Sequence, residues 1–355
     1  MRGKYTSWRR PLTARAGVRI THNDMQLLIV KTTSLGDLIH TLPALTDAAR
    51  AIPCLRADWL AESPFVEIPG WHPAVRRVIA SDLRRWRKAP LAAVRSGDWA
   101  RFREQLRQTR YDLVLDAQGL VKSAFLARRA DGPVAGPDWR SAREPLAALF
   151  YDRRHAVPPH GREHAITRTR RLFAAALGYP LPADLDQPPD AGLERSRFAA
   201  PDLGAPYALF LHGTTWPTKR WPFAHWQQLA RWFDTRGIAV VLPWGSEAER
   251  ADADAIAAAS PNARVLPKLG LSAIAGWIAH AQVIVGVDTG LMHLAAALGT
   301  PGLSLYGPTL PQMTGAFGRR QHWLCNADQP PTIDRARPLT VSVERVIEQL
   351  PSLLS

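Results

Sequence analysis

Residues 25–45 read MQLLIVKTTSLGDLIHTLPAL, and this stretch decides the class of fold. The short apolar run from Gln26 to Lys31 predicts a buried strand. A polar loop follows over 32–37, and a helical pattern then continues to Arg50. A buried strand, a short loop and a helix are the first half of a βαβ unit, in which the strands are parallel.

The same alternation of strands and helices occurs twice along the chain. In the first half we expect further strands at 56–60, 75–80 and 111–115, and a helix beginning at Leu120. After a region rich in Pro, Asp and Gly, the pattern restarts with strands at 207–211, 238–242, 283–287 and 302–306 and a helix over 222–236. The sequence therefore predicts an α/β protein with two Rossmann-like domains, whose parallel sheets face a cleft.

The domain boundaries follow from these shifts in pattern. A chain of 355 residues is long enough for two domains, since one domain takes about 100–200 residues. We expect a first domain over 25–185, a linker over 186–206, a second domain over 207–330 and a terminal segment over 331–355 with an amphipathic helix from Val341. Residues 1–24 are basic without the apolar core of a signal peptide, and are expected to form a disordered extension.

Composition restricts the function more loosely. The formal charge of +14 suggests an anionic partner, although an arginine-rich composition alone would produce the same value. The 13 Trp residues are scattered rather than interleaved with cations on one face, so nucleic acid is not the expected partner. Two isolated cysteines give neither a disulfide framework nor zinc spacing, which fits a reducing cytoplasm. We expect a monomer that needs no metal or other cofactor.

The segment Asp288-Thr289-Gly290-Leu291-Met292-His293 follows a buried strand and begins a helix. Amides at a helix N-terminus bind anions, and the helix dipole adds to the attraction. Gly290 would let a phosphate approach the backbone closely. Asp288 is either a ligand of sugar hydroxyls or a helix cap, and His293 is either a ligand or a core histidine.

A second polar loop, His212-Gly213-Thr214-Thr215, joins another strand to a helix and leads to Lys219. Two hydroxyls, a small glycine and a cation form a plausible phosphate cradle, although an ordinary capped loop has the same composition. Neither G-x-x-x-x-G-K-[ST] nor G-x-G-x-x-G is present, which argues against a kinase or a hydride-transfer enzyme. After the strand at 238–242, Glu247 or Glu249 either binds a ribose or starts a surface helix.

In the first domain, the loop Ser34-Leu35-Gly36-Asp37 carries a candidate general base. Gly36 allows a tight turn, and Asp37 either faces the cleft or caps the helix. Lys122 and Arg143 lie in further loops of this domain. They are either ligands of carboxylates or phosphates on a substrate, or ordinary surface charges.

Taken together, these motifs resemble glycosyltransferase family 9, the heptosyltransferases. The resemblance runs from Met25 to about Gly318 and rests on the segments LIVKTTSLGDLIHTLPAL (28–45), LDAQGLVKSA (115–124), SAREPLA (141–147), HGTTWPTKRWP (212–222), PWG (243–245), VDTGLMHLAAALGTP (287–301) and YGPT (306–309). It implies a GT-B architecture in which the second domain binds an ADP-heptose donor and the first binds the acceptor. It further implies an inverting, metal-independent transfer to a Kdo sugar of Kdo2-lipid A, at the inner face of the cytoplasmic membrane.

The resemblance also assigns roles to individual residues. It implies that Asp37 and Lys219 are catalytic. It implies donor contacts from Thr214, Thr215, Lys219, Glu247 or Glu249, Asp288, Thr289, Gly290, Leu291 and His293. It implies acceptor contacts from Ser34, Gly36, Lys122 and Arg143. The helix from Val341 would fold back on the first domain.

Two features bear on which reaction of the family is expected. The loop Thr32-Thr33-Ser34-Leu35-Gly36-Asp37 and the Thr214-Thr215 pair both favour the enzymes that add the first heptose over those that add the second. Met292 stands where the family pattern has a small polar residue. The alternatives are a family member with another acceptor, or a GT-B sugar-nucleotide epimerase. If the chain adds the first heptose, we expect a basic, cytoplasmic protein that is peripheral to the membrane. Its partners would be an anionic nucleotide sugar, an anionic glycolipid and an anionic membrane surface.

Overall fold

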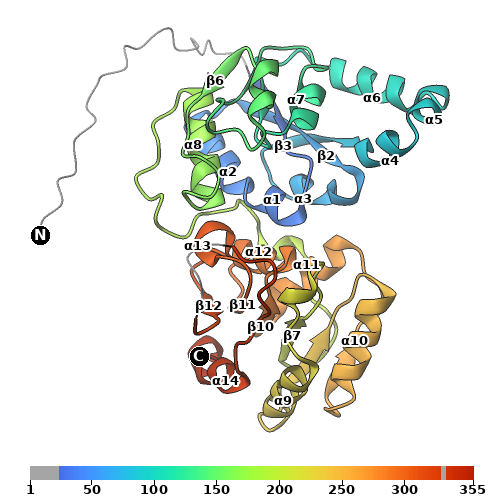
Figure 1. The fold of residues 1–355 in the computed structure, drawn as a ribbon, viewed down its shortest axis with the longest axis vertical. Helices are drawn as coiled ribbons and strands as arrows, with labels where there is room; N and C mark the ends of the chain where they lie inside the picture. The colour runs from blue at the N-terminus through green and yellow to red at the C-terminus, as the bar shows by residue number, and fades with distance from the viewer. Residues whose placement is uncertain (1–23, 329–332) are drawn as a thin grey trace, which may run out of the picture.

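The computed structural model describes residues 24–328 and 333–355, which form two α/β units stacked one above the other (Figure 1). Each unit is built on a six-stranded parallel sheet, so the predicted fold class is confirmed. The extension expected over 1–24 lies outside the described residues apart from Asp24, whose carboxylate lies 2.6 Å from Nε of Arg56.

The first unit has the strand order β3-β2-β1-β4-β5-β6. Its strands are β1 (Met25–Val30), β2 (Leu55–Glu62), β3 (Val75–Ser81), β4 (Leu113–Asp116), β5 (Val134–Pro137) and β6 (Arg153–His155). Its α-helices are α1 (Leu35–Ile39), α2 (Leu42–Ala51), α3 (Glu67–Gly70), α4 (Leu83–Lys88), α5 (Pro90–Arg95), α6 (Asp98–Arg107), α7 (Val121–Ala127) and α8 (Ala165–Leu177). The first unit also contains two 3-10 helices, Ser63–Phe65 and Pro145–Phe150.

The second unit has the strand order β12-β11-β10-β7-β8-β9. Its strands are β7 (Tyr207–Leu211), β8 (Ala239–Leu242), β9 (Ala263–Val265), β10 (Val283–Val287), β11 (Gly302–Tyr306) and β12 (Gln321–Cys325). Its α-helices are α9 (Phe223–Asp234), α10 (Glu247–Ala257), α11 (Leu271–His280), α12 (Gly290–Ala297), α13 (Pro311–Thr314), α14 (Val343–Gln349) and α15 (Pro351–Leu354). Further 3-10 helices lie at Arg195–Arg197, before β7, and at Pro217–Lys219.

Both sheets follow the doubly wound order, in which successive strands are added outward on one side of a central pair and then on the other side. That pair is β1 and β4 in the first unit and β7 and β10 in the second. The central strands are buried on both faces, which explains why their sequences are continuous apolar runs rather than alternating ones. Polar loops that follow these strands therefore lie at the crevice where such sheets bind ligands.

One apolar cluster continues from the first unit into the second. It includes Trp71 and Phe198, whose rings pack edge to face at 5.2 Å, together with Ile274 and Ile278 of α11. The indole Nε1 of Trp71 also lies 3.3 Å from the hydroxyl of Ser272. The two units are therefore packed together along this side.

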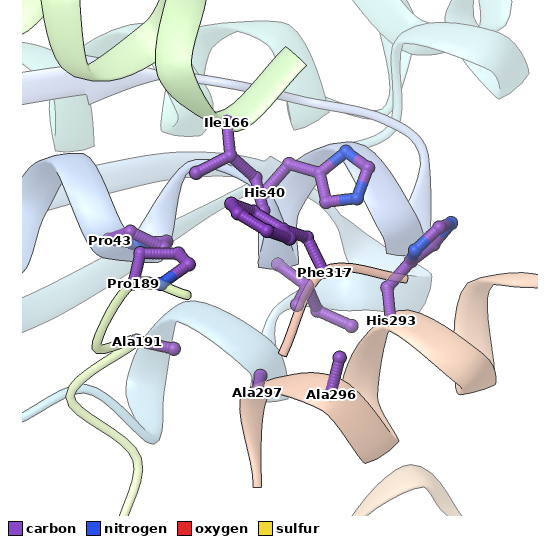
Figure 2. Close-up of a pocket in the computed structure, with 10 residues that line it drawn as sticks. His40, Pro43, Ile166, Pro189, Ala191, His293, Ala296, Ala297 and Phe317 are labelled. Atoms are coloured by element: carbon purple, nitrogen blue, oxygen red, sulfur yellow. The ribbon is translucent and has the colours of Figure 1, made fainter. Parts of the chain in front are cut away.

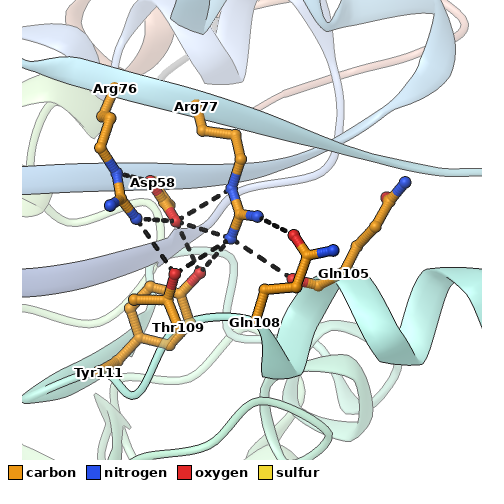
Figure 3. Close-up of polar contacts among 7 residues, drawn as sticks. All are labelled: Asp58, Arg76, Arg77, Gln105, Gln108, Thr109 and Tyr111. Atoms are coloured by element: carbon orange, nitrogen blue, oxygen red, sulfur yellow. Dashed lines mark hydrogen bonds and ion pairs between the residues drawn. The ribbon is translucent and has the colours of Figure 1, made fainter.

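A buried carboxylate cross-links strands of the first unit (Figure 3). Asp58 on β2 accepts hydrogen bonds from Arg76 at 2.9 and 3.0 Å, from Arg77 at 2.9 and 3.2 Å and from the hydroxyl of Tyr111 at 2.8 Å. Burial alone would raise the pKa of Asp58, but these hydrogen bonds and positive charges outweigh it and lower the pKa. Burial and the contact with Asp58 raise the pKa of Tyr111 to about 12. The network fixes β2 and β3 against the segment that leads into β4.

The terminal helix does not fold back on the first unit, so that expectation was wrong. Its apolar residues are buried against α9 in the core of the second unit, among them Val343, Val346 and Leu350. The indole of Trp221 fixes the preceding segment by donating to the carbonyl of Val341 at 2.7 Å. A local apolar stripe predicts a packed helix, but only the partner's complementary surface decides where it packs.

Candidate active site

The loop after β1 is held in place by one amide side chain from the loop after β4. Oε1 of Gln118 accepts from the backbone N–H of Thr32 at 2.8 Å, and its Nε2 donates to the carbonyl of Thr33 at 2.8 Å. Asp116, which is fully buried, in turn accepts the backbone N–H groups of Gln118 and Gly119 at 2.9 and 3.2 Å. The start of α1 is therefore positioned by the first unit's switch-point strands.

Asp37 lies in the first turn of α1 and belongs to a capping box. Its Oδ2 accepts from the backbone N–H and the hydroxyl of Ser34 at 3.0 and 3.2 Å. Burial would raise the pKa of Asp37, but the charge of Lys31, the hydrogen bonds from Ser34 and the charge of Arg143 outweigh it and lower the pKa. Asp37 is therefore a carboxylate at neutral pH. The helix-capping interpretation of Asp37 is observed, and it leaves Oδ1 for a second role.

Lys31 is a cation near Asp37 that was not among the predicted site residues. Lys31 directly follows β1, and its Nζ lies 3.0 Å from the carbonyl of Ala117. Burial lowers the pKa of Lys31, while the charges of Asp37 and Asp116 oppose that shift. The charge of Arg168 on α8 acts on Lys31 and lowers its pKa further. Lys31 could have been predicted from the sequence, because it ends the first apolar run and so lies at the carboxyl end of a buried strand. No local sequence feature predicts that Arg168 lies near it.

The predicted acceptor residues separate into two groups. Ser34 is exposed beside Asp37, and the charge of exposed Arg143 reaches the same carboxylate. Lys122 instead lies near Glu62, a buried carboxylate at the end of β2. Burial raises the pKa of Glu62, while the charges of Arg84 and Lys122 oppose that shift. Arg143 and Lys122 thus lie beside two different carboxylates, Asp37 and Glu62.

In the second unit, the lysine and the aspartate selected from the motifs form a pair. Nζ of Lys219 lies 2.7 Å from Oδ2 of Asp288, and both side chains are largely buried. The same ammonium lies 4.4 Å from the centroid of the Trp216 ring. Thr309 donates its hydroxyl to Asp288 at 2.7 Å. Thr214 and Thr215 precede Lys219 in the same loop, with Thr215 exposed.

The N-termini of α1 and α12 meet across the two units. A Cβ on Gly290 would lie 2.7 Å from Cδ2 of Leu35 and 3.3 Å from the backbone N of Gly36. A Cβ on Gly36 would lie 2.6 Å from Cδ2 of His293. Both glycines are therefore required by close approach. The contact places the amides that begin α12 beside the first turn of α1, and amides at a helix N-terminus favour an anion.

A cavity lined by residues of both units borders this contact. Leu35 comes from the first unit, and the remaining lining residues from the second are Leu211, Gly213, Pro243, Trp244, Gly245, Glu249, Leu271, Ile274, Thr289 and Leu291. The mixture of apolar walls and polar backbone suits a nucleotide.

The cavity distinguishes the two candidate ribose ligands. Oε2 of Glu249 accepts from the backbone N–H groups of Gly245 and Ser246 at 2.7 and 3.2 Å. Its Oε1 faces Gly213, where an added Cβ would lie 2.8 Å away. The side chain of Glu247 is 76% exposed and lies 3.8 Å from Arg250. Of the two carboxylates, Glu249 is the one that lines the cavity.

His293 does not line this cavity but lies beside His40, with which it lines a separate pocket (Figure 2). Its ring centroid is 4.3 Å from that of His40, which is 5.6 Å from that of His164. Burial lowers the pKa of all three, to about 4 for His164. His293 is therefore a neutral, buried side chain that packs between the units against Gly36, close to the charges of Asp288 and Asp37.

Within residues 24–328 and 333–355, no three His, Cys, Asp or Glu side chains lie close enough together to bind a metal ion. Over the same residues, no helix is long and apolar enough to cross a membrane.

Two Rossmann-like units with polar loops at both switch points are the arrangement of an α/β ligand-binding enzyme. Residues 99–341 match the family model for glycosyltransferase family 9 (heptosyltransferase), and the chain belongs to that family. Lipopolysaccharide heptosyltransferase 1 of Pseudomonas aeruginosa is 57% identical over 298 residues, which cover 84% of this chain and 82% of that protein.

Solved structures show the same likeness. E. coli heptosyltransferase WaaC with ADP has a TM-score of 0.84 and 43% identity, and the match covers 93% of this chain and 100% of that one. The same enzyme with ADP-2-deoxy-2-fluoro heptose has a TM-score of 0.81 and 43% identity, over 92% of this chain and 99% of that one.

Proposed function

We propose that this protein transfers a heptose from ADP-heptose to a Kdo sugar of the lipopolysaccharide inner core. One observation carries the proposal. The contact of α1 with α12 brings the carboxylate Asp37 to the same interdomain space as the Lys219–Asp288 pair and the N-terminus of α12. The similarity to enzymes named lipopolysaccharide heptosyltransferase 1, and to one bound to an ADP-heptose analogue, supports the choice of donor.

The donor would occupy the second unit. The base and ribose of ADP would fill the cavity beside Trp244, with the ribose hydroxyls on the free Oε1 of Glu249. The diphosphate would lie against the amides of Thr289 and Gly290 and the Thr214–Thr215 loop. Lys219 would exchange part of its contact with Asp288 for a phosphate oxygen, which leaves Asp288 to accept hydroxyls of the sugar.

The chemistry is a single displacement at the anomeric carbon. The Asp37 carboxylate takes the proton from the attacking Kdo hydroxyl while the new C–O bond forms and the bond to the β-phosphate breaks. Attack opposite to the leaving group inverts the anomeric centre. Negative charge develops on the departing ADP, where fixed amides and Lys219 stabilise it without reorganising. We propose that these groups suffice without a divalent metal.

The first unit supplies a positive surface for the acceptor. Lys31, Arg143 and Lys122 lie along the carboxyl edge of its sheet, and carboxylates and phosphates are the groups that such cations bind. An acceptor that carries both fits this edge. Because such an acceptor is a glycolipid, we propose that the protein works at the cytoplasmic face of the inner membrane.

The deciding experiment is transfer from ADP-heptose to Kdo2-lipid A with purified protein, with EDTA present, read by mass spectrometry of the acceptor. A gain of one heptose is the expected result. Transfer only after Mg²⁺ is added would keep the reaction and overturn its independence from metal. A folded, ADP-binding protein that transfers nothing in either condition would overturn the choice of acceptor.

A further inference from the structure

Helices α4 and α5 project from the edge of the first unit (Figure 1). Their inner side is rigidly packed, because Leu83, Trp86 and Ala93 are buried and the Trp86 ring contacts the rings of Trp99 and Phe102 at 5.5 and 5.0 Å. The outer side chains are therefore presented by a fixed platform.

That outer side carries two apolar side chains that face solvent. Leu91 is 71% exposed and Val94 is 66% exposed, which makes them the two most exposed large hydrophobic side chains in the part of the chain that the structure describes. They are three residues apart on α5 and so share one face of the helix. A single exposed leucine needs no explanation, but an adjacent pair on one helix suggests a surface that is covered in use.

Cations surround this apolar pair. Arg87 and Lys88 precede it, Arg95 follows it, and all three are exposed. Within the described residues none of these three has an ion-pair partner, whereas Arg85 on the same platform pairs with Asp82 at 2.8 Å and with Asp98 at 2.9 Å. Uncompensated positive charge next to exposed leucine and valine is the pattern of a helix that lies in a membrane interface.

We propose that α5, with Arg87 and Lys88 before it, is an anchor that inserts Leu91 and Val94 into the headgroup region of an anionic bilayer. The position of the platform agrees with the proposed function, on which this inference rests. At the start of α4, Nε of Arg84 lies 3.5 Å from Glu62, the carboxylate that Lys122 also faces, so the anchor adjoins the edge assigned to the acceptor. An anchor there would hold that edge against the surface in which a glycolipid is embedded.

The chemistry of the patch favours a bilayer over other partners. Single-stranded nucleic acid is bound by aromatic side chains that stack on bases, and the exposed side chains here are aliphatic. Leucine and valine are suited instead to the acyl boundary, while each Arg or Lys at an anionic surface strengthens binding about fivefold.

The test is sedimentation of the full chain with vesicles of phosphatidylcholine alone or mixed with phosphatidylglycerol, without donor or acceptor. We expect binding to the anionic vesicles that weakens with added salt. Leu91→Ser with Val94→Ser should weaken it about tenfold or more, and Arg87→Gln with Lys88→Gln by about twentyfold. Leu181→Ser is the matched control, because Leu181 is an exposed leucine on a loop that carries acidic residues. It should bind like the parent.

Three outcomes would overturn the anchor: no binding of the parent to anionic vesicles, unchanged binding after Leu91→Ser with Val94→Ser, or loss only when Leu146 and Leu149, which are also exposed, are changed to serine. Transfer to an acceptor dispersed in detergent separates this inference from the proposed function. The Leu91→Ser and Val94→Ser variant should keep that transfer while losing transfer to acceptor in vesicles. A parent that binds vesicles but transfers nothing in detergent would refute the proposed function and leave the anchor standing.

Discussion

Glu249→Ala should weaken ADP binding, and Glu247→Ala should leave it unchanged. The two glutamates are two residues apart in the first turn of α10, so each variant removes the same kind of side chain from the same turn of the helix. Only Glu249 lines the cavity assigned to the donor, and its Oε1 is directed at Gly213 while Oε2 holds the loop. Glu247 is 76% exposed beside Arg250.

The magnitude follows from the contacts of each oxygen. A hydrogen bond to a charged group contributes about 1.5–3 kcal/mol, so loss of the ribose contact through Oε1 corresponds to an increase in Kd of about 10- to 150-fold. Loss of the two backbone hydrogen bonds to Oε2 removes one side of a capping box, which costs about 1–2 kcal/mol of stability. Glu247→Ala should change the free energy of unfolding by less than about 0.5 kcal/mol.

Isothermal titration calorimetry with ADP, well below the unfolding temperature of each variant, measures the affinity, and thermal unfolding without ligand measures the stability separately. Equal loss of affinity in both variants would show that the position of Glu249 at the cavity does not make it the ribose ligand. Unchanged affinity in Glu249→Ala would refute the placement of the ribose. Loss of stability alone would assign Glu249 to helix capping.

Three further predictions concern the first unit. Asp37→Asn should lower the rate of transfer about 10²- to 10⁴-fold and leave the Kd for ADP unchanged, and a near-normal rate would refute the role of base. Asp58→Asn should cost about 3–5 kcal/mol at neutral pH in chemical denaturation. Because the folded protein lowers the pKa of Asp58, that stability exists above the ordinary aspartate pKa and is lost as the pH falls through the folded value; a cost independent of pH would contradict the ion network. Gly36→Ala places a Cβ 2.6 Å from the His293 ring and should cost about 1–3 kcal/mol and slow transfer, while Gly70→Ala, with 3.8 Å of space, should do neither.

The division of the chain into two α/β units was predictable because the central strands are continuous apolar runs between polar loops. The expected strands at 207–211, 283–287 and 302–306 coincide with β7, β10 and β11. The helix expected from the first loop to Arg50 is broken into α1 and α2, with Pro43 in the first turn of the second. The terminal helix is similarly divided before Pro351. Short strands such as β6 and β9 escaped prediction, because three residues carry too little periodicity.

The sequence by itself also selected the polar loops that meet between the units, because polar residues that follow buried parallel strands must gather at one edge of a sheet. Residue types at those positions, such as Asp37, Lys219 and Gly290, were sufficient to name candidate roles, which the experiments above test.

Only the tertiary structure decided how distant segments meet. It placed Glu249 at the cavity and Glu247 in solvent, paired Lys219 with Asp288, and packed the terminal helix on the second unit. It also brought Lys31 and Arg143 to Asp37. The physical reason is that a periodic pattern specifies which face of an element is buried, whereas the partner that buries it, and the charges that shift a carboxylate's pKa, come from segments far away in the chain.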